Sequence, residues 1–483
     1  MSKAIFILLK QKVGISMKRR KFLRLSLNTI AAAVSVSLLG CSGSESNSSN
    51  PPSLPDDEGG VKVPESMGFR ATNIEYLIRE DGTAKIVSDM SSFYPKGYKA
   101  DESPLGLKIY YVDAENGSLN GDGLSWRTAM KSINTAINQS DVDAVLIAGG
   151  QHYGIDNDGV MAMGTYSGDR DVALISVGEP AIISSARAVT WSLYDGEVYR
   201  SSPTGGSIPK VIDLSQEDEF GDPLELTQVD SIEELEDNCF FFDSDLRVLV
   251  KLNDGREPDE NILCLRSFAN QVSAQGVKWY ARNIKWYSAY SGALRYQGCG
   301  EDTVAIVEDC DFGYSSLDGL CVRDIGLSIA RRCISYRNSN DAFNYHQRNG
   351  LDPHGIEEDC IGYNSQKSGT GNGSTAHENC RVIRVNCEYY KNKGPGIADI
   401  QTSKSFNVAV VSRDNYSSSN SWGFLATDEV EMWIIGGSAY KNSGWNRGGS
   451  VAFKNTSIGH IKDLVTDDDI VAIDNAYVSD FLG

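Results

Sequence analysis

The chain has five histidines, and three of them lie between positions 346 and 377. His346 and His354 are eight residues apart in 341-DAFNYHQRNGLDPHGIEEDC-360, and His377 ends 372-NGSTAH-377. An imidazole can serve as acid, base or metal ligand near neutral pH, although a single histidine is more commonly a solvated or core residue. The elements that hold these three residues decide between an acid–base centre, a metal site and chance.

An internal repeat supplies those elements. Cys310, Cys333, Cys360 and Cys387 are spaced by 23, 27 and 27 residues. Each is followed by a tyrosine and then by a turn-prone Asn/Ser/Lys cluster, and weaker copies continue at 412–419 and 438–445. This period suits one coil of a parallel β-helix, with three short strands and three turns. Leucine-rich repeats share the period, but their leucine pattern is missing.

The start of the body predicts how such a stack begins. Residues 108–137 read as a strand, a Gly/Asn/Asp-rich loop and an amphipathic helix capped by Ser125, with Ala129, Ile133, Ala136 and Ile137 on its apolar face. This arrangement resembles the start of right-handed parallel β-helix proteins of the pectin-lyase-like superfamily, in which a short helix closes the open end of the coil. We therefore expect an all-β chain, a right-handed parallel β-helix with a short N-terminal capping helix.

The whole chain divides into four predicted parts. Residues 1–41 read as an export signal, and 38-LLGC-41 resembles a bacterial lipoprotein lipobox, which implies lipidation at Cys41. Residues 42–61 form a Ser/Pro/Gly-rich tether, residues 62–106 a small β region with a hairpin at 68–90, and residues 107–483 the β-helix domain. Residues 239–262 also read as strands around an Asn-Asp-Gly turn.

The cysteines of the repeat predict an internal column. Equivalent positions of successive coils stack about 4.8 Å apart, and cysteine behaves there as a small apolar side chain. The same spacing is within disulfide reach, so bridges remain an alternative to the free buried thiols that we favour. The chain contains no Cys-x-x-Cys pair, which argues against a structural zinc site.

A second strand of each repeat brings polar residues together. We align 318-DGLCVR-323, 341-DAFNYH-346, 372-NGSTAH-377, 395-PGIADI-400 and 422-WGFLAT-427. Strand alternation then places Asn344 and Thr375 in one outward column, and Arg323, His346 and His377 in another. Asp399 joins the second column if the register slips by one residue at 394–396. His354 falls in the loop between the two strands that carry the other histidines.

The resemblance implies a polysaccharide substrate, and the outward column suits uronate chemistry. Removing the weakly acidic C5 proton of a uronate requires a cation on its carboxylate and a base at C5. Arg323, or calcium, is the candidate cation, and His346 or His377 the candidate base. Tyr345 is the candidate acid if its side chain is outward, and Asp399 and His354 complete the candidate site. Asn344, Arg348 and Thr375 are candidate substrate contacts.

A short motif points the same way. Asp352-Pro353-His354 is similar to the Asp-Pro-His of mannuronan C5-epimerases. In that family a Tyr-Gly pair usually precedes the motif, whereas this chain has Asn349-Gly350. The match covers three residues and indicates uronate chemistry without assigning it.

Three other interpretations remain open. His346, His354 and His377 could together bind zinc. Two carboxylates could hydrolyse a glycoside, with Asp341, Asp352, Glu357, Glu358 and Asp399 as candidates. The protein could also be a non-catalytic glycan binder or adhesin, because a fold does not determine a function. The run 467-DDD-469 could attract calcium, and the alternative is a solvated acidic turn.

Charge and the N-terminus predict the partners. The net charge of −20 and the pI near 4.7 argue against nucleic acid. Basic residues nevertheless outnumber acidic ones between 323 and 413, which suits an anionic substrate. We expect a monomer that is exported and anchored to a bacterial membrane through a lipid on Cys41, in the periplasm or at the cell surface.

Overall fold

The computed structural model describes residues 61–71, 74–78, 82–95, 107–156, 159–418, 420–444 and 447–480. The predicted lipoprotein segment 1–41 with Cys41, and the tether up to residue 60, lie outside them. One compact unit comprises Glu58–Gln216 and Pro223–Gly483. The other described segment, Glu217–Asp222, is a turn in which Asp218 Oδ1 accepts hydrogen bonds from the amides of Phe220 and Asp222.

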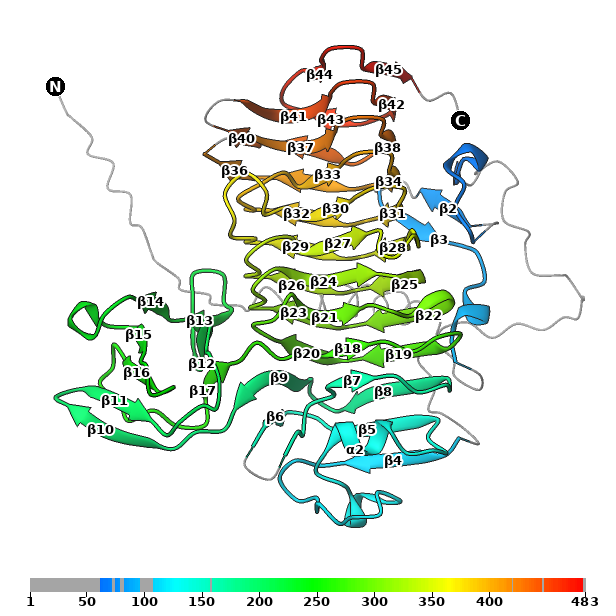
Figure 1. The fold of residues 1–483 in the computed structure, drawn as a ribbon. Helices are drawn as coiled ribbons and strands as arrows, with labels where there is room; N and C mark the ends of the chain where they lie inside the picture. The colour runs from blue at the N-terminus through cyan, green and yellow to red at the C-terminus, as the bar shows by residue number, and fades with distance from the viewer. Residues whose placement is uncertain are drawn as a thin grey trace, which may run out of the picture. The chain divides into compact units, whose positions relative to one another are not determined.

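The large unit is a parallel β-helix of about 12 turns, as predicted. Figure 1 shows its strands stacked coil upon coil. Each full coil contributes one strand to each of three sheets, here named sheets I, II and III. Among the described residues, no helix has the length and apolar character needed to cross a bilayer.

Sheet I is parallel throughout. Its strands are β4 (Ile109–Val112), β5 (Ala144–Ala148), β8 (Val172–Val177), β19 (Lys278–Arg282), β22 (Gly300–Glu308), β25 (Ile325–Arg331), β28 (His354–Glu358), β31 (Arg381–Val385), β34 (Lys404–Val408), β38 (Glu431–Ile435), β42 (Ile458–Lys462) and β45 (Tyr477–Asp480).

Sheet II is parallel within the stack and antiparallel where β17 pairs with β9 and β12. Its strands are β6 (His152–Ile155), β9 (Ala181–Arg187), β12 (Lys210–Glu217), β13 (Pro223–Glu225), β17 (Ile262–Leu265), β20 (Ile284–Tyr287), β23 (Asp311–Gly313), β26 (Ile334–Tyr336), β29 (Ile361–Tyr363), β32 (Glu388–Tyr390), β35 (Val411–Arg413), β39 (Ser438–Tyr440) and β43 (Val465–Thr466).

Sheet III is parallel and holds the polar columns predicted above. Its strands are β7 (Thr165–Tyr166), β18 (Gln271–Val272), β21 (Gly292–Tyr296), β24 (Asp318–Arg323), β27 (Phe343–His346), β30 (Ser374–Ala376), β33 (Ile397–Asp399), β37 (Asn420–Ala426), β41 (Arg447–Phe453) and β44 (Ile470–Ala472). Two short strands, β36 (Tyr416–Ser417) and β40 (Ser443–Gly444), pair with each other and directly precede β37 and β41 in the sequence.

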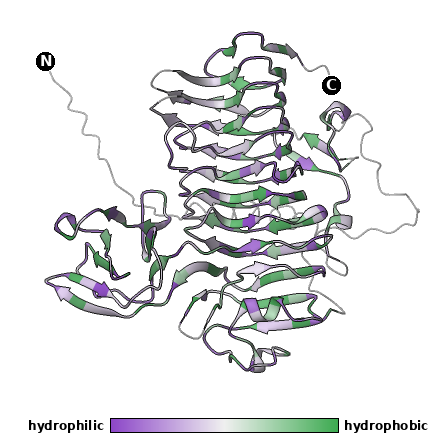
Figure 2. Ribbon diagram, in the orientation of Figure 1, coloured by the Kyte–Doolittle hydropathy of each residue, from purple (hydrophilic) through white to green (hydrophobic). Residues whose placement is uncertain are grey.

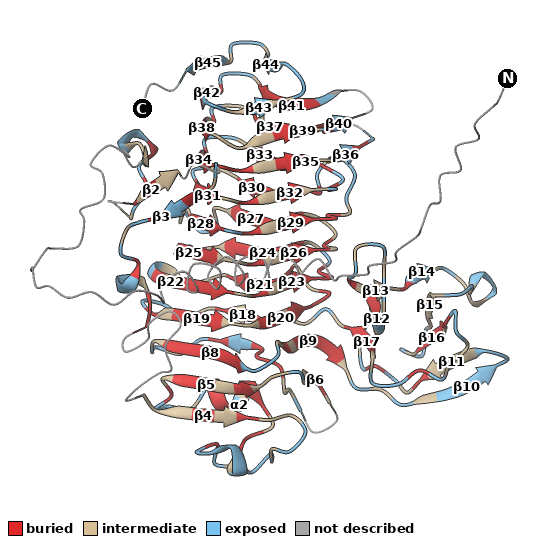
Figure 3. Ribbon diagram, turned by 180° about the vertical axis from the view of Figure 1, so that it is seen from behind, coloured by how far each residue is buried: buried red, intermediate tan, exposed pale blue. Residues whose placement is uncertain are grey.

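Two further sheets lie outside the stack. The predicted hairpin at 68–90 is confirmed as β2 (Glu75–Ile78) and β3 (Ala84–Ile86), and β1 (Val61–Lys62) pairs with β2. A five-stranded sheet is inserted between β9 and β17, which the repeat did not predict. It contains β10 (Trp191–Asp195), β11 (Val198–Ser201), β14 (Thr227–Val229), β15 (Cys239–Phe242) and β16 (Val248–Lys251). Figure 3 shows the stacked strands mostly buried and β10 largely exposed.

The predicted capping helix is present but shorter and capped differently. The α-helix α2 spans Ile133–Ile137, and the side chain of Ser132 accepts a hydrogen bond from the Thr135 amide. Ser125 instead precedes the 3₁₀ turn η3 (Trp126–Thr128) and makes no capping bond to its backbone. The other 3₁₀ turns are η1 (Glu65–Met67), η2 (Ser91–Phe93) and η4 (Ile232–Glu234). Ser132 caps because its own backbone is extended, with φ −108° and ψ 121°, and the helical residues begin at Ile133.

Single left-handed residues make the corners of the coils. Asp309, Arg332 and Asp359 have φ between 52° and 54°, and each lies between a strand of sheet I and the repeat cysteine. Short polar side chains tolerate this conformation better than branched ones. At the next corner, asparagines stack inside the coil, where Asn415 Oδ1 accepts from the amide and the side chain of Asn392. The Asn/Ser part of the repeat therefore satisfies buried backbone groups.

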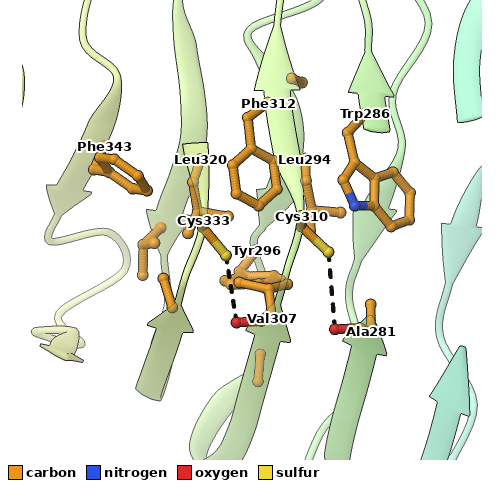
Figure 4. Packing of buried hydrophobic residues seen from close by; sticks show 14 of the residues in the cluster. Ala281, Trp286, Leu294, Tyr296, Val307, Cys310, Phe312, Leu320, Cys333 and Phe343 are labelled. Carbon is orange, nitrogen blue, oxygen red and sulfur yellow. Dashed lines mark hydrogen bonds between the residues drawn. The ribbon is translucent and has the colours of Figure 1, made fainter. Parts of the chain in front are cut away.

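The cysteine column consists of free thiols, as we favoured. Cys310, Cys333, Cys360 and Cys387 are all buried and unbridged. Each donates to a carbonyl of the preceding coil, and Figure 4 shows Cys310 and Cys333 doing so toward Ala281 and Val307. Burial raises the pKa of the Cys360 thiol well above its ordinary value, so the thiolate does not form. Figure 2 shows hydrophobic and hydrophilic residues interleaved along these strands.

We predict that the thiols of this column do not react until the protein unfolds. Alkylation of the native protein should leave Cys310, Cys333, Cys360 and Cys387 unmodified, because no reagent reaches them. Alkylation after unfolding without reductant should modify all nine described cysteines, as read by peptide mass spectrometry. A disulfide between two of these four column cysteines would contradict the free-thiol column.

Candidate active site on sheet III

The outer face of sheet I and part of sheet II are in contact with other parts of the chain. Residues before the stack, among them Tyr76 and Ile86, pack on the outward side chains Ile356, Ile383 and Phe406 of sheet I in one hydrophobic cluster. On sheet II, Phe240 and Val248 of the inserted sheet pack with Val211 of β12 and Cys264 of β17 in one hydrophobic cluster. Within the described part, neither layer hydrogen-bonds to a strand of sheet III. The outer face of sheet III is therefore the candidate site.

The predicted register of sheet III is confirmed. Leu320 pairs with Phe343, and Arg323 pairs with His346. Phe343 pairs with Ser374, and Asn344 pairs with Thr375. Because parallel strands pair without offset here, side chains at equivalent positions form continuous columns across the coils. His346 and His377 are therefore neighbours, although 30 residues separate them in the chain.

The two histidines form a stacked pair with an acidic partner. Their ring centroids lie 3.5 Å apart at an interplanar angle of 14°. His346 Nδ1 lies 3.3 Å from both carboxylate oxygens of Glu378, and 29% of each of these two side chains is exposed. An ionised carboxylate only accepts hydrogen bonds, so this contact places the proton on Nδ1. Nε2 of His346 then keeps its lone pair and can act as a base.

Burial keeps both histidines neutral. It lowers the pKa of His346, an effect that Arg323 reinforces and Glu378 opposes. It lowers the pKa of His377 to about 3, with His346 and Arg323 acting in the same direction. Two imidazolium rings stacked in contact would repel each other, so the neutral pair is the stable form.

Two carboxyl groups lie beside the histidines. Asn344 Nδ2 donates to Asp318 Oδ1 at 3.2 Å and to Asp341 Oδ2 at 2.7 Å, so one amide nitrogen joins both side chains. Burial raises the pKa of Asp318, and burial together with Asp318 raises that of Asp341. Both shifts favour the protonated forms of these carboxyl groups.

Several buried polar atoms on this face have no hydrogen-bond partner. They are Asp318 Oδ2, Arg323 Nε, Asn344 Oδ1 and Asn372 Oδ1. The nearest ionic contact of Asp318 Oδ2 is Arg323 Nη2 at 3.8 Å, which is too long for a hydrogen bond. Each unsatisfied buried group costs about 1–3 kcal/mol. A polar ligand or water on this face would satisfy them.

The three predicted substrate contacts have different surroundings. Asn344 and Thr375 belong to the outward column but are buried, and Asn372 Nδ2 donates to Thr375 Oγ1 at 2.9 Å. They therefore form the floor of the site. Arg348 is exposed, and its Nη1 donates to Gln297 Oε1 at 2.8 Å. Of the three, Arg348 alone presents a charge to solvent.

Asp399 and Tyr345 point into the coil, so neither has the outward position on which its candidate role depended. Asp399 pairs with Ala376, which means that the register does not slip at 394–396. Its carboxylate accepts from Arg384 at 2.9 and 3.1 Å and from the Ala376 amide at 3.2 Å. Tyr345 is fully buried, and burial raises the pKa of its phenol well above the ordinary value. Neither group reaches a substrate on the outer face.

His354 also lies elsewhere than predicted. It begins β28 of sheet I, whereas the loop ends before it. Its Nδ1 accepts the Arg70 amide at 3.0 Å, and its ring centroid is 5.1 Å from that of Phe69. Burial, with Arg70 and Arg381, lowers its pKa to about 4. The N-terminal residues thus cover His354, and the Asp-Pro-His match does not belong to the candidate site.

The metal set predicted from three histidines is therefore replaced. His346, His377 and Glu378 each offer a ligand atom, and these atoms lie within 4.8 Å of one another. Two imidazoles and one carboxylate can hold zinc with an open position. At 467–469, Asp467 instead accepts hydrogen bonds from the Lys441 amide and Ser450 Oγ, which is a structural use of that carboxylate.

Sequence reasoning missed Asp318 and Glu378 as members of the site. A signal for Asp318 was present, because Asp318 and Asp341 begin aligned strands on successive coils. Glu378 directly follows His377 and has φ 48°, so the left-handed corner turns its side chain back toward His346. Strand alternation alone does not predict that return.

Comparisons with known proteins concern the fold. No family model matches the chain, and no curated protein matches it. Pectate lyase Pel9A shares 14% identity at a TM-score of 0.43, over 77% of this chain and 79% of its own. XylC, solved with xylose, shares 12% at 0.44, over 74% and 70%. The A-module of the Azotobacter vinelandii mannuronan C-5 epimerase AlgE4 shares 12% at 0.39, over 73% and 76%. Likeness at this level does not transfer an activity.

We predict that stability falls as the pH drops from about 6.5 toward 4. The pKa of His354 falls to about 4 in the folded state, and that of His377 to about 3. The unfolded chain therefore binds more protons in this window, and each proton taken up favours unfolding, by a few kcal/mol in total. Urea unfolding at several pH values measures the trend. His354→Gln should flatten it, and an unchanged slope in that variant would contradict the role of His354.

Proposed function

We propose that the protein acts on an acidic polysaccharide and removes the C5 proton of a uronate, as a lyase or an epimerase. The observation that carries this proposal is the neutral His346, whose Nδ1 proton is held by Glu378 and whose strand neighbour is Arg323. A base with a free lone pair beside a fixed cation is what C5 proton abstraction requires.

In this mechanism Arg323 neutralises the uronate carboxylate and His346 Nε2 takes the C5 proton. The electron pair of the C5–H bond moves into the carboxyl group opposite Arg323. In elimination, this pair then forms the C4–C5 double bond while the C4–O bond breaks, and the leaving oxygen takes a proton. In epimerisation, C5 regains a proton from the opposite side. Asp318, whose pKa burial raises, is the candidate donor.

The second candidate function is hydrolysis of a glycosidic bond. It rests on the Asp318 and Asp341 carboxyl groups, which share the amide of Asn344 and whose pKa values burial raises. A protonated carboxyl and an ionised one are the acid and the nucleophile or base of glycosidases. A glycan-binding protein without activity is the remaining alternative.

We predict uronate turnover on polyuronates with free carboxyl groups. Alginate, pectate and other polyuronates are incubated with the protein, and the ultraviolet absorbance of the unsaturated product, the proton NMR ratio of uronate epimers and the reducing ends are followed. His346→Ala should lower the rate by about 10²–10⁴. His460→Gln is a matched control, because His460 also contacts a carboxylate, Glu431, at 3.2 Å, but on sheet I.

The pH profile tests the partner of the base. Glu378 raises the pKa of His346, so Glu378→Gln should lower it and move the acid limb of kcat/KM to lower pH. The rate at the optimum should also fall, because the Nδ1 proton is no longer held.

Chelators should not change the rate. Loss of activity on chelation that zinc restores would show that a metal site, and not the His346 base, carries the reaction. New reducing ends without unsaturation, abolished by Asp318→Asn, would favour hydrolysis.

We further propose that the protein is exported and held on a membrane by a lipid on Cys41. The basis is the sequence 38-LLGC-41 alone, because these residues lie outside the described part. In a bacterial host, Cys41→Ala should abolish incorporation of labelled fatty acid and move the protein from the membrane to the soluble fraction. An unaltered membrane fraction in that variant would contradict lipid anchoring.

A further inference from the structure

Arg295 lies on the outer face of sheet III, one coil before Arg323. It pairs with Cys321 in β24, and Cys321 pairs with Asn344 in β27. Arg295 therefore belongs to the column that contains Asn344 and Thr375. Only 7% of the surface of Arg295 is exposed.

The contacts of Arg295 leave its charge uncompensated. Nη1 donates to Ser291 Oγ at 3.0 Å, and the guanidinium lies 5.5 Å from the ring centroid of Tyr290. Nε is buried without a hydrogen-bond partner. Among the described residues, no carboxylate oxygen lies within ion-pair distance of this side chain. A hydroxyl and a ring face solvate a guanidinium only in part, because it has five N–H donors.

A second buried arginine shows what compensation looks like in this molecule. Arg384 is fully buried, and it makes two hydrogen bonds to Asp399, at 2.9 and 3.1 Å, and one to Ser374. Buried charges in proteins are paired because an isolated one is costly to desolvate. Arg295 breaks this rule on the face where a ligand would bind. An anion from solution would restore it.

The neighbouring charges favour the same ligand. Arg323, on the next coil, has one ionic contact with the described residues, the long 3.8 Å approach to Asp318. Arg348 is hydrogen-bonded to Gln297, which follows β21 by one residue. Guanidinium groups from three successive coils thus lie on one side of the histidine pair. Such a basic patch attracts an anionic polymer, although the net charge of the protein is −20.

We propose that Arg295 binds a second carboxylate of the substrate, on a sugar unit next to the one whose carboxylate meets Arg323. This inference rests on the proposed function and narrows its substrate to polymers with uronates at neighbouring positions. Adjacent coils are about 4.8 Å apart, and Arg323 lies two residues beyond Cys321, the partner of Arg295, so the α-carbons of the two arginines are diagonal neighbours about 8 Å apart. Their long side chains can therefore meet carboxylates on neighbouring sugar units. The small exposed area of Arg295 suits one compact anionic group.

The test separates binding from turnover. All proteins carry His346→Ala, so that the polymer is not consumed, and calorimetry measures the affinity for polygalacturonate and for alginate at low salt. Arg295→Gln should weaken binding about 10-fold or more, since a charge-assisted hydrogen bond contributes about 1.5–3 kcal/mol. The difference should shrink at high salt. Arg295→Lys, which keeps the charge but loses the planar fork, should fall between the two.

The matched control is Arg200→Gln. Arg200 in β11 also lies over a tyrosine ring, 5.3 Å from the centroid of Tyr194, but on the inserted sheet. This change should leave the affinity unaltered. Thermal unfolding of each variant shows whether it is folded. In a separate assay with His346 intact, Arg295→Gln should not lower the turnover rate of a substrate that contains a single uronate.

Several outcomes would overturn the proposal. Unchanged polyuronate affinity in folded Arg295→Gln removes the Arg295 subsite, whereas uronate turnover by the parent would leave the proposed function intact. Binding of a sulfated, uronate-free glycan that is lost on Arg295→Gln, without polyuronate binding, assigns the subsite to sulfate and contradicts a carboxylate. If the parent neither binds nor converts any polyuronate, the proposed function fails and the subsite fails with it.

Discussion

The in-register backbone pairing between successive coils is the constraint on which the site depends. Each strand of sheet III pairs with the next without offset, from β21 to β37. A slip of one residue would turn every outward side chain inward. The contact between the rings of His346 and His377 therefore follows from the ladder and needs no special loop. The same ladder brings Arg323 beside His346 and Asn344 beside Thr375.

The core behind this face contains an ionic cluster among apolar residues such as Phe343 and Ile397. Arg384 from sheet I lies between Glu357 and Asp399, and Tyr389 donates to Glu357 at 2.6 Å. Burial by itself would lower the pKa of Arg384, but the two carboxylates raise it, so the guanidinium stays charged. Removing one member of such a network leaves unpaired buried charge, at about 3–5 kcal/mol. The Ala376 amide, next to His377, donates to Asp399, so this cluster also holds the strand that carries a site histidine.

The columns could be predicted from sequence because strand alternation is a local rule. The aligned segments beginning at Asp318, Asp341 and Asn372 have the register found in the structure. Asp399 was misplaced because a slip was allowed at Gly394 and Gly396, whereas the ladder continues through them. The alternation that predicted the columns also places Tyr345 inside. For Asp399 and Tyr345, keeping strictly to the local rule would have given the correct side.

Other features depend on segments that are distant in the chain, and no local pattern contains them. His354 lies outside the site because it contacts Phe69 and Arg70, which lie more than 280 residues earlier in the chain. The inserted sheet packs on β12 and β17 of sheet II but has no periodic relation to the coils. Glu378 reaches His346 only because a left-handed corner follows β30. These placements required the three-dimensional packing, and they decide which of the three outer faces is open.

The electrostatics of the site join two opposing requirements. Arg323 must be positive to neutralise a substrate carboxylate, but its charge also lowers the pKa of His346 and weakens the base. Glu378 opposes that effect from the other side of the imidazole. A uronate carboxylate paired with Arg323 would cancel the field of the arginine at the ring, because opposite charges in contact largely screen each other at a distance. In the proposed mechanism, binding the carboxylate thus makes His346 a stronger base, and the base strengthens at the moment when the C5 proton comes within reach.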